Sequence, residues 1–188
     1  MTDFCGLTPT PFYFLRHGET DWNAQGLSQG TTDVRLNDTG RQQARDSAAL
    51  LARQGITQIF ASPLSRAAET ARLVAATLGV TITTDPDLRE ASFGVQEGLP
   101  MGTWYDDWVT GTYTPVGADI FATLRRRAVT AVNRAVTTPG PILIIAHGAF
   151  FRAVRAEMGL DARVRTANGV PLLCAPGEPA WSLTPLAD

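Results

Sequence analysis

Two histidines, the only two in the chain, each follow a short apolar run and precede a glycine. The two segments are residues 12–18 (FYFLRHG) and 142–148 (ILIIAHG). Continuous apolarity is typical of strands covered on both faces of a parallel sheet, and such strands end at the edge where open α/β sheets bind ligands. The pattern therefore predicts that His17 and His147 meet at that edge, where imidazole can act as a nucleophile or move a proton.

Two arginines are expected at the same edge. Arg16 directly precedes the first histidine, and Arg66 lies in the first turn of a predicted helix that has Ser62 as its N-cap and Pro63 in that turn. Guanidinium groups suit phosphate oxygens, and a helix N-terminus adds partial positive charge. Such a crevice would bind a dianionic phosphate and stabilise a phosphoryl group in transfer. The glycine after each histidine would let the backbone approach that ligand closely.

Spacing alone leaves a plainer interpretation open. A histidine after a strand is often a hydrogen-bonded residue of the core or the sheet edge, and an arginine in a helical first turn is often simply solvated. The types and positions of these four residues are therefore consistent with an anion-binding site but also with purely structural roles.

The rest of the chain alternates helices and strands, which predicts one domain over residues 1–188 with a three-layer α/β/α sandwich and a mostly parallel central sheet. Asn37 is the expected N-cap of the first long helix, and Gly79 is expected to end the second. The expected helices cover about residues 38–54, 62–78, 119–136 and 149–158. The expected strands cover about 12–15, 56–61, 80–84 at a sheet edge and 142–146, with a hairpin over 170–174 and 180–183.

Residues 85–117 interrupt this alternation and are too long for a plain connection. The three large aromatic residues Trp104, Tyr105 and Trp108 argue against disorder, so we expect a short insertion that covers the carboxyl edge of the sheet. The two tryptophans are at helical spacing on one face. Stacking of these aromatics on a substrate and packing within the insertion both remain open.

Composition excludes several classes of function. The net charge is −2 and the basic residues form no long run, so we expect neither a nucleic acid nor a membrane as partner. All 16 positive side chains are arginine, and the absence of lysine excludes Schiff-base and P-loop chemistry. No apolar run reaches membrane-spanning length and the start of the chain lacks the pattern of a signal peptide, which predicts a cytoplasmic protein. Cys5 and Cys174 are expected to be reduced thiols, although a pair is conceivable.

Four motifs together resemble the histidine phosphatase superfamily, also called the phosphoglycerate mutase-like family. They occur in family order between about residues 12 and 148, and a matching segment at residues 36–44 lies between the first two. Each motif alone is weak, but the set is specific. The motifs are Leu15-Arg16-His17-Gly18-Glu19-Thr20-x-x-Asn23, Ser62-Pro63-Leu64-Ser65-Arg66-Ala67-x-x-Thr70-Ala71, Leu88-Arg89-Glu90-x-x-Phe93-Gly94-x-x-Glu97-Gly98 and His147-Gly148.

The resemblance implies a role for each matching residue. His17 would attack phosphorus to form a phosphohistidine, and Glu90 would protonate the leaving oxygen and then activate water. The phosphoryl oxygens would be held by Arg16, Arg66 and His147, with Asn23 as a peripheral donor. Glu97 is a weaker candidate acid, because Glu97-Gly98 is typical of a turn. No metal-ligand cluster is visible in the sequence, and the resemblance implies neither a metal nor another cofactor.

Some positions depart from the family pattern. Residues 117–120 read Gly-Ala-Asp-Ile where many members have Gly-Gly-Glu-Ser, and Gln96 replaces a frequent tryptophan. The covering insertion is short for a mutase, and the lysine that mutases place near the substrate carboxylate is absent. A mutase must keep its phosphoenzyme from water until it returns the phosphoryl group, so both departures favour hydrolysis.

The sequence therefore predicts a metal-independent phosphoric monoester hydrolase that acts on a small phosphomonoester. A sugar phosphate, a nucleoside-type phosphate such as α-ribazole phosphate, and a carboxylated phosphate are all open as substrates. Phosphoglycerate mutase-type transfer is the first alternative, and a non-catalytic phosphate-binding protein is the second. The oligomeric state is not determined by the sequence, a homodimer being one option.

Overall fold

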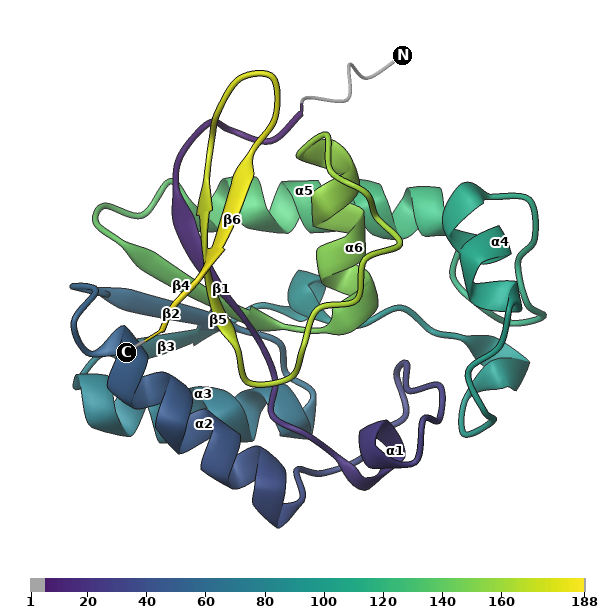
Figure 1. The fold of residues 1–188 in the computed structure, drawn as a ribbon, viewed down its shortest axis with the longest axis horizontal. Coiled ribbons are helices and arrows are strands. Elements are labelled where there is room, and N and C mark those ends of the chain that lie inside the picture. The colour runs from purple at the N-terminus through teal and green to yellow at the C-terminus, as the bar shows by residue number, and fades with distance from the viewer. Residues whose placement is uncertain (1–5, 188) are drawn as a thin grey trace.

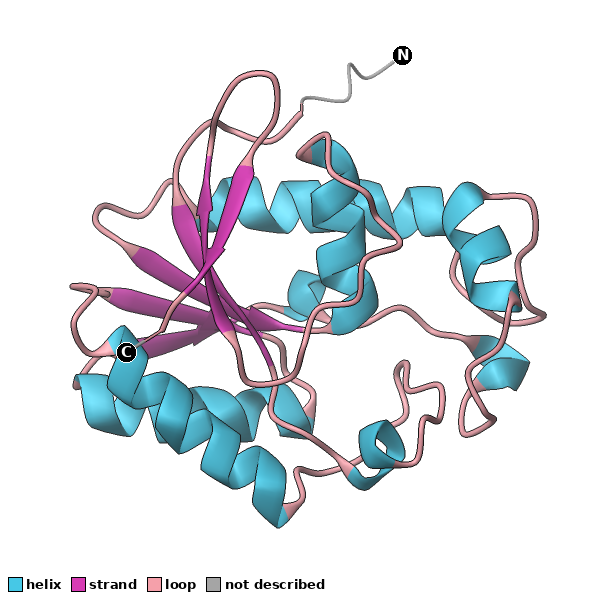
Figure 2. Cartoon of the chain, viewed as in Figure 1, coloured by secondary structure: helices cyan, strands magenta, loops and turns pink. Residues whose placement is uncertain are grey.

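The computed structural model describes residues 6–187, and its centre is a six-stranded sheet with helices on both faces (Figures 1 and 2). The strands lie in the order β3-β2-β4-β1-β5-β6; the first four are parallel to one another, whereas β5 pairs antiparallel with β1 and with β6. This confirms the predicted α/β sandwich with a mostly parallel sheet. The strands are β1 (Phe12–Arg16), β2 (Gln58–Ala61), β3 (Thr81–Thr84), β4 (Ile142–Ala146), β5 (Pro171–Ala175) and β6 (Ser182–Pro185).

Two pairs of helices form the outer layers. Helices α2 (Asp38–Leu51) and α3 (Ser65–Leu78) cover one face of the sheet, and α5 (Phe121–Ala135) and α6 (Gly148–Glu157) cover the other (Figure 1). The side chain of Asn37 accepts a hydrogen bond from the Gly40 N–H, which confirms the predicted N-cap of α2. Gly79 ends α3 with φ of +69°, a left-handed conformation that glycine adopts without strain.

The predicted start of α3 at Ser62 is wrong. The helix begins at Ser65, with Leu64 in the N-cap position, because Ser62 is committed elsewhere: its hydroxyl contacts His147 and accepts the Leu64 N–H. The Ser65 N–H is instead met by the carboxylate of Asp33, which reaches the helix from a distant loop. Arg66 nevertheless lies in the first helical turn, as predicted.

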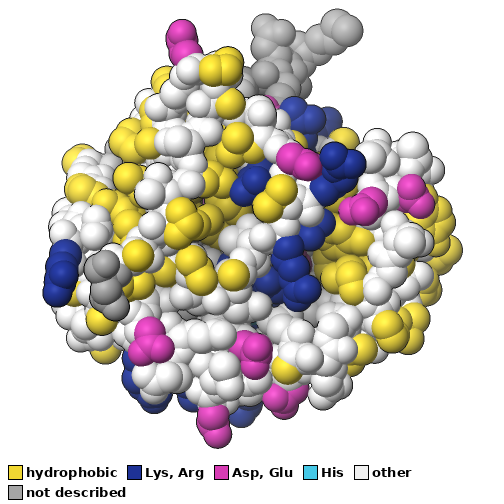
Figure 3. All heavy atoms as spheres, in the orientation of Figure 1, with side chains coloured by type: hydrophobic (Ala, Val, Ile, Leu, Met, Phe, Trp, Pro, Cys, Tyr) yellow, Lys and Arg dark blue, Asp and Glu magenta, His cyan; other side chains and the backbone are white. Residues whose placement is uncertain are grey.

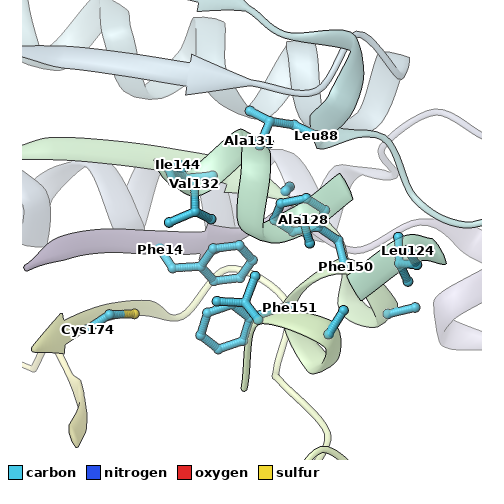
Figure 4. Close-up of a cluster of buried hydrophobic side chains, with 14 of the residues drawn as sticks. Phe14, Leu88, Leu124, Ala128, Ala131, Val132, Ile144, Phe150, Phe151 and Cys174 are labelled. Carbon is cyan, nitrogen blue, oxygen red and sulfur yellow. The ribbon is translucent and has the colours of Figure 1, made fainter. Parts of the chain in front are cut away.

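The strand residues alternate between two cores, one under each helical layer. On β4, Ile142 and Ile144 face α5 and α6, whereas Leu143 and Ile145 face α2 and α3, and all four are almost fully buried. Phe14 on β1 stacks on Phe151 of α6 with ring centroids 3.8 Å apart (Figure 4). Burial of both strand faces explains the continuous apolar runs in the sequence.

The predicted covering insertion corresponds to residues 85–117, here called the covering segment. It contains two 3₁₀ turns, η1 (Pro86–Leu88) and η2 (Gly94–Gln96), and the short helix α4 (Trp104–Thr110). Trp108 is fully buried, donates its indole N–H to the Asp119 carbonyl at 2.7 Å, and packs edge-on against Phe93. The indole of Trp108 is therefore core, which decides between the two interpretations left open for it. The covering segment also exposes several large apolar side chains, namely Val95, Leu99, Met101 and Val116.

The tail forms the predicted hairpin, β5 with β6, and β3 is an edge strand as expected. The polar loop after β1 includes one short helix, α1 (Asp21–Ala24), which the sequence did not predict. Cys174 is buried, whereas Cys5 lies outside the described residues. Across residues 6–187, none of the helices has the length and apolarity needed to cross a membrane.

Candidate active site

His17 lies at the carboxyl end of β1 and is 2% exposed. Its backbone N–H donates to the Ala146 carbonyl on the adjacent strand β4, at 3.0 Å. His147 directly follows Ala146, the last residue of β4, and the two imidazole centroids are 5.2 Å apart. Parallel pairing of β1 with β4 therefore brings together two histidines that are 130 positions apart in the sequence.

The hydrogen bonds of His17 define which ring nitrogen is available. Burial, followed by the charges of Arg66 and Arg16, lowers the pKa of His17 well below 6.5, so the ring is neutral at pH 7. Nδ1 lies 2.7 Å from the Gly18 carbonyl, which can only accept, so Nδ1 carries the proton. Nε2 therefore presents a lone pair, which receives the Arg66 Nε–H at 3.3 Å. A neutral imidazole with one fixed N–H and one lone pair is poised as a nucleophile.

His147 is fully buried and neutral for similar reasons. Burial, then the charge of Arg66, lowers the pKa of His147 well below 6.5. Its Nε2 lies 2.7 Å from the hydroxyl of Ser62. Its Nδ1 is buried and has no hydrogen-bond partner in the described part of the chain.

Arg16 and Arg66 are buried cations held by carbonyl groups. Arg16 Nη1 donates to the Thr166 carbonyl at 2.8 Å, and Arg66 Nη2 donates to the Gly30 carbonyl at 2.7 Å. Burial lowers the pKa of each to about 10, which leaves both charged at neutral pH. Within residues 6–187 neither forms an ion pair with a carboxylate, so their charge is available to an anion.

Glu90 is 5% exposed and joins the site to the start of α6. Its Oε1 accepts the N–H groups of Ala91 and Phe150 at 3.1 and 2.8 Å, and its Oε2 accepts the Ala149 N–H at 2.8 Å. Burial raises the pKa of Glu90, although these N–H groups and Arg66 oppose the rise. A carboxyl group with a raised pKa near Arg16 and Arg66 can exchange a proton with a bound group.

A polar network supports the loop that carries His17. Asn168 Nδ2 donates to the His17 carbonyl at 2.9 Å and to Asn23 Oδ1 at 3.1 Å, and Asn23 Nδ2 donates to Gln29 Oε1 at 3.1 Å. Gln29 is buried, and its Nε2 has no partner among the residues described. Thr70 adds a further support, because its hydroxyl accepts the Gly18 N–H and donates to the Arg66 carbonyl.

Glu97 has a structural environment instead of a catalytic one. Both of its oxygens accept hydrogen bonds from the backbone and hydroxyl groups of Thr31 and Thr32, and Oε1 also accepts the Phe93 N–H. Burial opposes ionisation, but these donors prevail and lower the pKa of Glu97. It therefore stays ionised and ties the loop before Asp33 to the covering segment.

The glycines of the site make close backbone contacts. A Cβ on Gly18 would lie 2.2 Å from the Gly40 carbonyl oxygen, and a Cβ on Gly148 would lie 3.4 Å from Arg16 Nε. Their small size thus allows contacts within the protein itself, and the predicted close approach of a ligand to both positions stays a prediction.

Gly18→Ala is expected to destabilise the fold by about 3 kcal/mol, because backbone atoms of α2 cannot move away from a new Cβ as a flexible side chain would. Thermal unfolding should show a midpoint lower by roughly 6–12 °C. Gly6→Ala is the matched control, since no atom lies within 4 Å of a Cβ there. Equal unfolding midpoints for the two variants would contradict the close contact.

A cleft of about 200 Å³ opens beside Arg16 and Glu90. Asn23 and Gln29 line it from the loop after β1, and Tyr105 lines it from the covering segment. The side chains of His17, Arg66 and His147 are not part of its lining and are buried next to it. A ligand of the cleft would therefore have one end against the buried cluster and the other against the covering segment.

The structure thus places the sequence-predicted residues Arg16, His17, Arg66, Glu90 and His147 in one cluster, with Asn23 at its edge. In residues 6–187, no group of three or more His, Cys, Asp or Glu side chains is arranged to hold a metal ion. Sequence reasoning missed several supports. Thr70 is inside a recognised motif but has no role assigned by the sequence, and Asn168 has none either. Gln29, Arg152 and Arg165 carried no local signal, apart from the placement of Arg152 four residues after Gly148 on the same helix.

Comparison with known proteins gives a family match over most of the chain. A model described as histidine phosphatase superfamily (branch 1) matches residues 12–168. A protein named probable phosphoglycerate mutase GpmB, from Yersinia pestis (strain Pestoides F), is 34% identical over 171 residues, which cover 85% of this chain and 75% of the relative.

Solved structures share the fold. A mycobacterial glucosyl-3-phosphoglycerate phosphatase, solved as a complex with VO3, matches with a TM-score of 0.82 and 25% identity over 93% of this chain and 97% of its own. A phosphoserine phosphatase from Entamoeba histolytica, in complex with 3-phosphoglyceric acid, matches with a TM-score of 0.79 over 95% and 98% of the two chains. At 21% identity the second match reflects the fold alone.

Proposed function

The chain belongs to the histidine phosphatase superfamily (branch 1), and from this premise we propose that it is a metal-independent phosphatase that hydrolyses a small phosphomonoester through a phosphohistidine on His17. The observation that carries the proposal is the state of that ring. Nδ1–H is fixed by the Gly18 carbonyl, and the Nε2 lone pair points at a guanidinium. Such a ring can attack phosphorus without first losing a proton.

Binding of the phosphoryl group requires Arg66 to change partners. Its Nε–H occupies the Nε2 lone pair of His17, which is the position that phosphorus must approach. We expect the guanidinium to turn onto the phosphoryl oxygens, together with Arg16. The Ser62 hydroxyl already accepts the Leu64 N–H, which favours donation of its own proton to His147 Nε2. His147 would then carry its proton on Nδ1 and could donate it to a phosphoryl oxygen. Asn23 is a further donor at the edge. These fixed positive groups would stabilise the charge that spreads over the equatorial oxygens.

Glu90 completes the two steps of hydrolysis. In the first step Nε2 forms a bond to phosphorus as the ester P–O bond breaks, and protonated Glu90 gives its proton to the leaving oxygen. In the second step the Glu90 carboxylate takes a proton from water, whose oxygen attacks phosphorus and releases His17 and inorganic phosphate. Glu90 is thereby protonated again, and neither step consumes a further reactant.

Phosphoryl transfer between positions of a phosphoglycerate is the second candidate, and the name of the Yersinia relative favours it. Hydrolysis is preferred because the covering segment is short and because a mutase would need to keep water from the phosphoenzyme. The name of the mycobacterial phosphatase agrees with this preference. A non-catalytic phosphate-binding protein is the third candidate, and the nucleophile, acid and cations clustered here argue against it.

The test is a panel of phosphomonoesters assayed for phosphate release in the presence of a chelator, including p-nitrophenyl phosphate, sugar phosphates, nucleotides and phosphoglycerates. We expect turnover on the order of 1–1,000 s⁻¹ on the best substrate, unaffected by the chelator. Phosphoryl exchange between 2- and 3-phosphoglycerate faster than phosphate release would identify a mutase. Binding of phosphate without any turnover would identify a binding protein.

A further inference from the structure

Two arginines line the cleft in addition to the residues of the proposed reaction. Arg152 lies on α6, and Arg165 is an exposed residue of the loop that follows it. The guanidinium carbon of Arg152 lies 4.4 Å from the centre of the Tyr105 ring. In the part of the chain that the structure describes, neither arginine forms an ion pair with a carboxylate.

The cleft and the buried cluster next to it together contain four arginines, more than the two that the proposed reaction uses to hold one phosphoryl group. Arg16 lines the same cleft, and the charge of Arg165 contributes, after burial, to the lowered pKa of Arg16. Two acids also line the cleft: Glu90, which is held by backbone N–H groups, and Asp106, which is exposed. Figure 3 shows basic side chains gathered near the middle of the face that it draws, next to a group of apolar side chains. Repulsion among neighbouring cations is offset when a bound ligand carries more than one anionic group.

We propose that Arg152 and Arg165 form a subsite for a second anionic group, carried by the leaving group of the phosphomonoester. The inference rests on the proposed function and specifies its substrate class. Glu90 must lie next to the scissile oxygen, so the rest of the leaving group extends from there into the cleft. Arg152 is held in place by its stacking on Tyr105, and a pre-positioned guanidinium binds a carboxylate or phosphate through two parallel hydrogen bonds.

The dimensions of the cleft restrict the leaving group. Its volume of about 200 Å³ lies below the ~300–1,000 Å³ of pockets for drug-sized ligands. Leu27, Phe93 and Met101 provide apolar surface between the polar groups. A short carbon chain that ends in a carboxylate or a second phosphate fits these features, whereas a long neutral alcohol would leave both arginines without a partner.

Matched substrate pairs test this subsite. In the first pair, 3-phosphoglycerate is compared with glycerol 3-phosphate, which replaces the carboxylate by a hydroxymethyl group. In the second, 1,3-propanediol bisphosphate is compared with the monophosphate of the same diol. We expect kcat/KM to be at least 30-fold higher for the doubly anionic member of one pair, and the pair that shows the preference identifies the second anion. A ratio near one in both pairs would overturn the proposal.

Substitutions then connect the preference to the two residues. Arg165→Gln alters an exposed side chain and should preserve the fold while reducing the preference about tenfold; Arg152→Gln with Arg165→Gln should remove it, mainly through KM. Arg126→Gln on α5, an exposed arginine outside the cleft, is the matched control and should keep the full preference. A preference that survives the double substitution would also overturn the subsite.

The outcomes separate this inference from the proposed function. If no member of either pair and no other phosphomonoester is hydrolysed, the proposed function fails. If the phosphomonoesters are hydrolysed without a preference for the second anion, only the subsite fails.

Discussion

Replacement of His17 by alanine is expected to lower kcat/KM by at least ~10⁴-fold on every phosphomonoester that the protein hydrolyses. The expectation follows from the position of Nε2, the one lone pair of the imidazole, beside two cations that remain charged at pH 7. Without that nitrogen the chain retains groups that bind the phosphoryl oxygens but has no atom to form the phosphoenzyme. The measurement is steady-state kinetics, together with acid-labile, base-stable labelling of the protein by substrate in a rapid quench.

The control for this substitution is His17→Asn. The asparagine amide can still donate to the Gly18 carbonyl, which now accepts from Nδ1 at 2.7 Å, so the loop keeps its main local contact. We expect the variant to unfold at a temperature close to that of the original protein, to bind inorganic phosphate, and to show neither turnover nor labelling. Substantial activity in a folded His17 variant would exclude the nucleophile assignment, and labelling on another residue would relocate it.

The acid limb of the pH profile provides a further check on the same ring. Because burial and the adjacent arginines lower the pKa of His17 well below 6.5, the ring stays neutral as the pH falls from 8 to 6. Activity should therefore show no loss from protonation of His17 over this interval. A solvated histidine would lose half of its neutral form near pH 6.5.

The two segments in which a strand is followed by histidine and glycine could be predicted from the sequence, because the pattern that identifies them lies within a few consecutive residues. A strand buried on both faces needs consecutive apolar residues, and parallel neighbours end at one edge of the sheet, so positions 17 and 147 could be expected to meet. The start of α3 could not be predicted. Serine is a residue type that often forms an N-cap, but the hydroxyl of Ser62 bonds to His147, which is 85 positions away. Long-range contacts of this kind leave no trace in local spacing.

The same limit applies to the supports of the site. Asn168 donates a hydrogen bond to the His17 carbonyl across 151 positions, and nothing in the sequence around Asn168 indicates this contact. Arg165 lies in an irregular loop with no periodicity, so nothing in the chain around it indicated that it lines the cleft. The residues that cluster at the sheet edge were therefore predictable by type and order, and their chemical roles stay a prediction, whereas the groups that support the cluster and shape the cleft required the tertiary structure.

Glu90→Gln is expected to reduce turnover of alkyl phosphates by about 10³-fold and that of p-nitrophenyl phosphate by less than tenfold in the phosphorylation step. An alkoxide leaves poorly without a proton, whereas p-nitrophenolate leaves without one, so the loss should follow the pKa of the leaving alcohol. The measurement is the rate of phosphoenzyme formation in a rapid quench with both esters. Equal losses on the two substrates would show that Glu90 acts by orienting α6 and not by supplying a proton.

The pH dependence of this variant separates proton transfer from a structural effect. Burial raises the pKa of Glu90, so its protonated fraction, and with it the cleavage of alkyl esters, should fall as the pH rises through that value. Glutamine does not titrate, so this alkaline limb should be absent in the variant. The glutamine side chain has only one oxygen, so its NH2 group must face the N–H of either Ala149 or Phe150, which Glu90 now accepts. The loss of that hydrogen bond should cost about 1–2 kcal/mol of stability. A small drop in the unfolding temperature is therefore expected together with the loss of the limb, whereas a limb that persists unchanged in Glu90→Gln would assign the titration to another group.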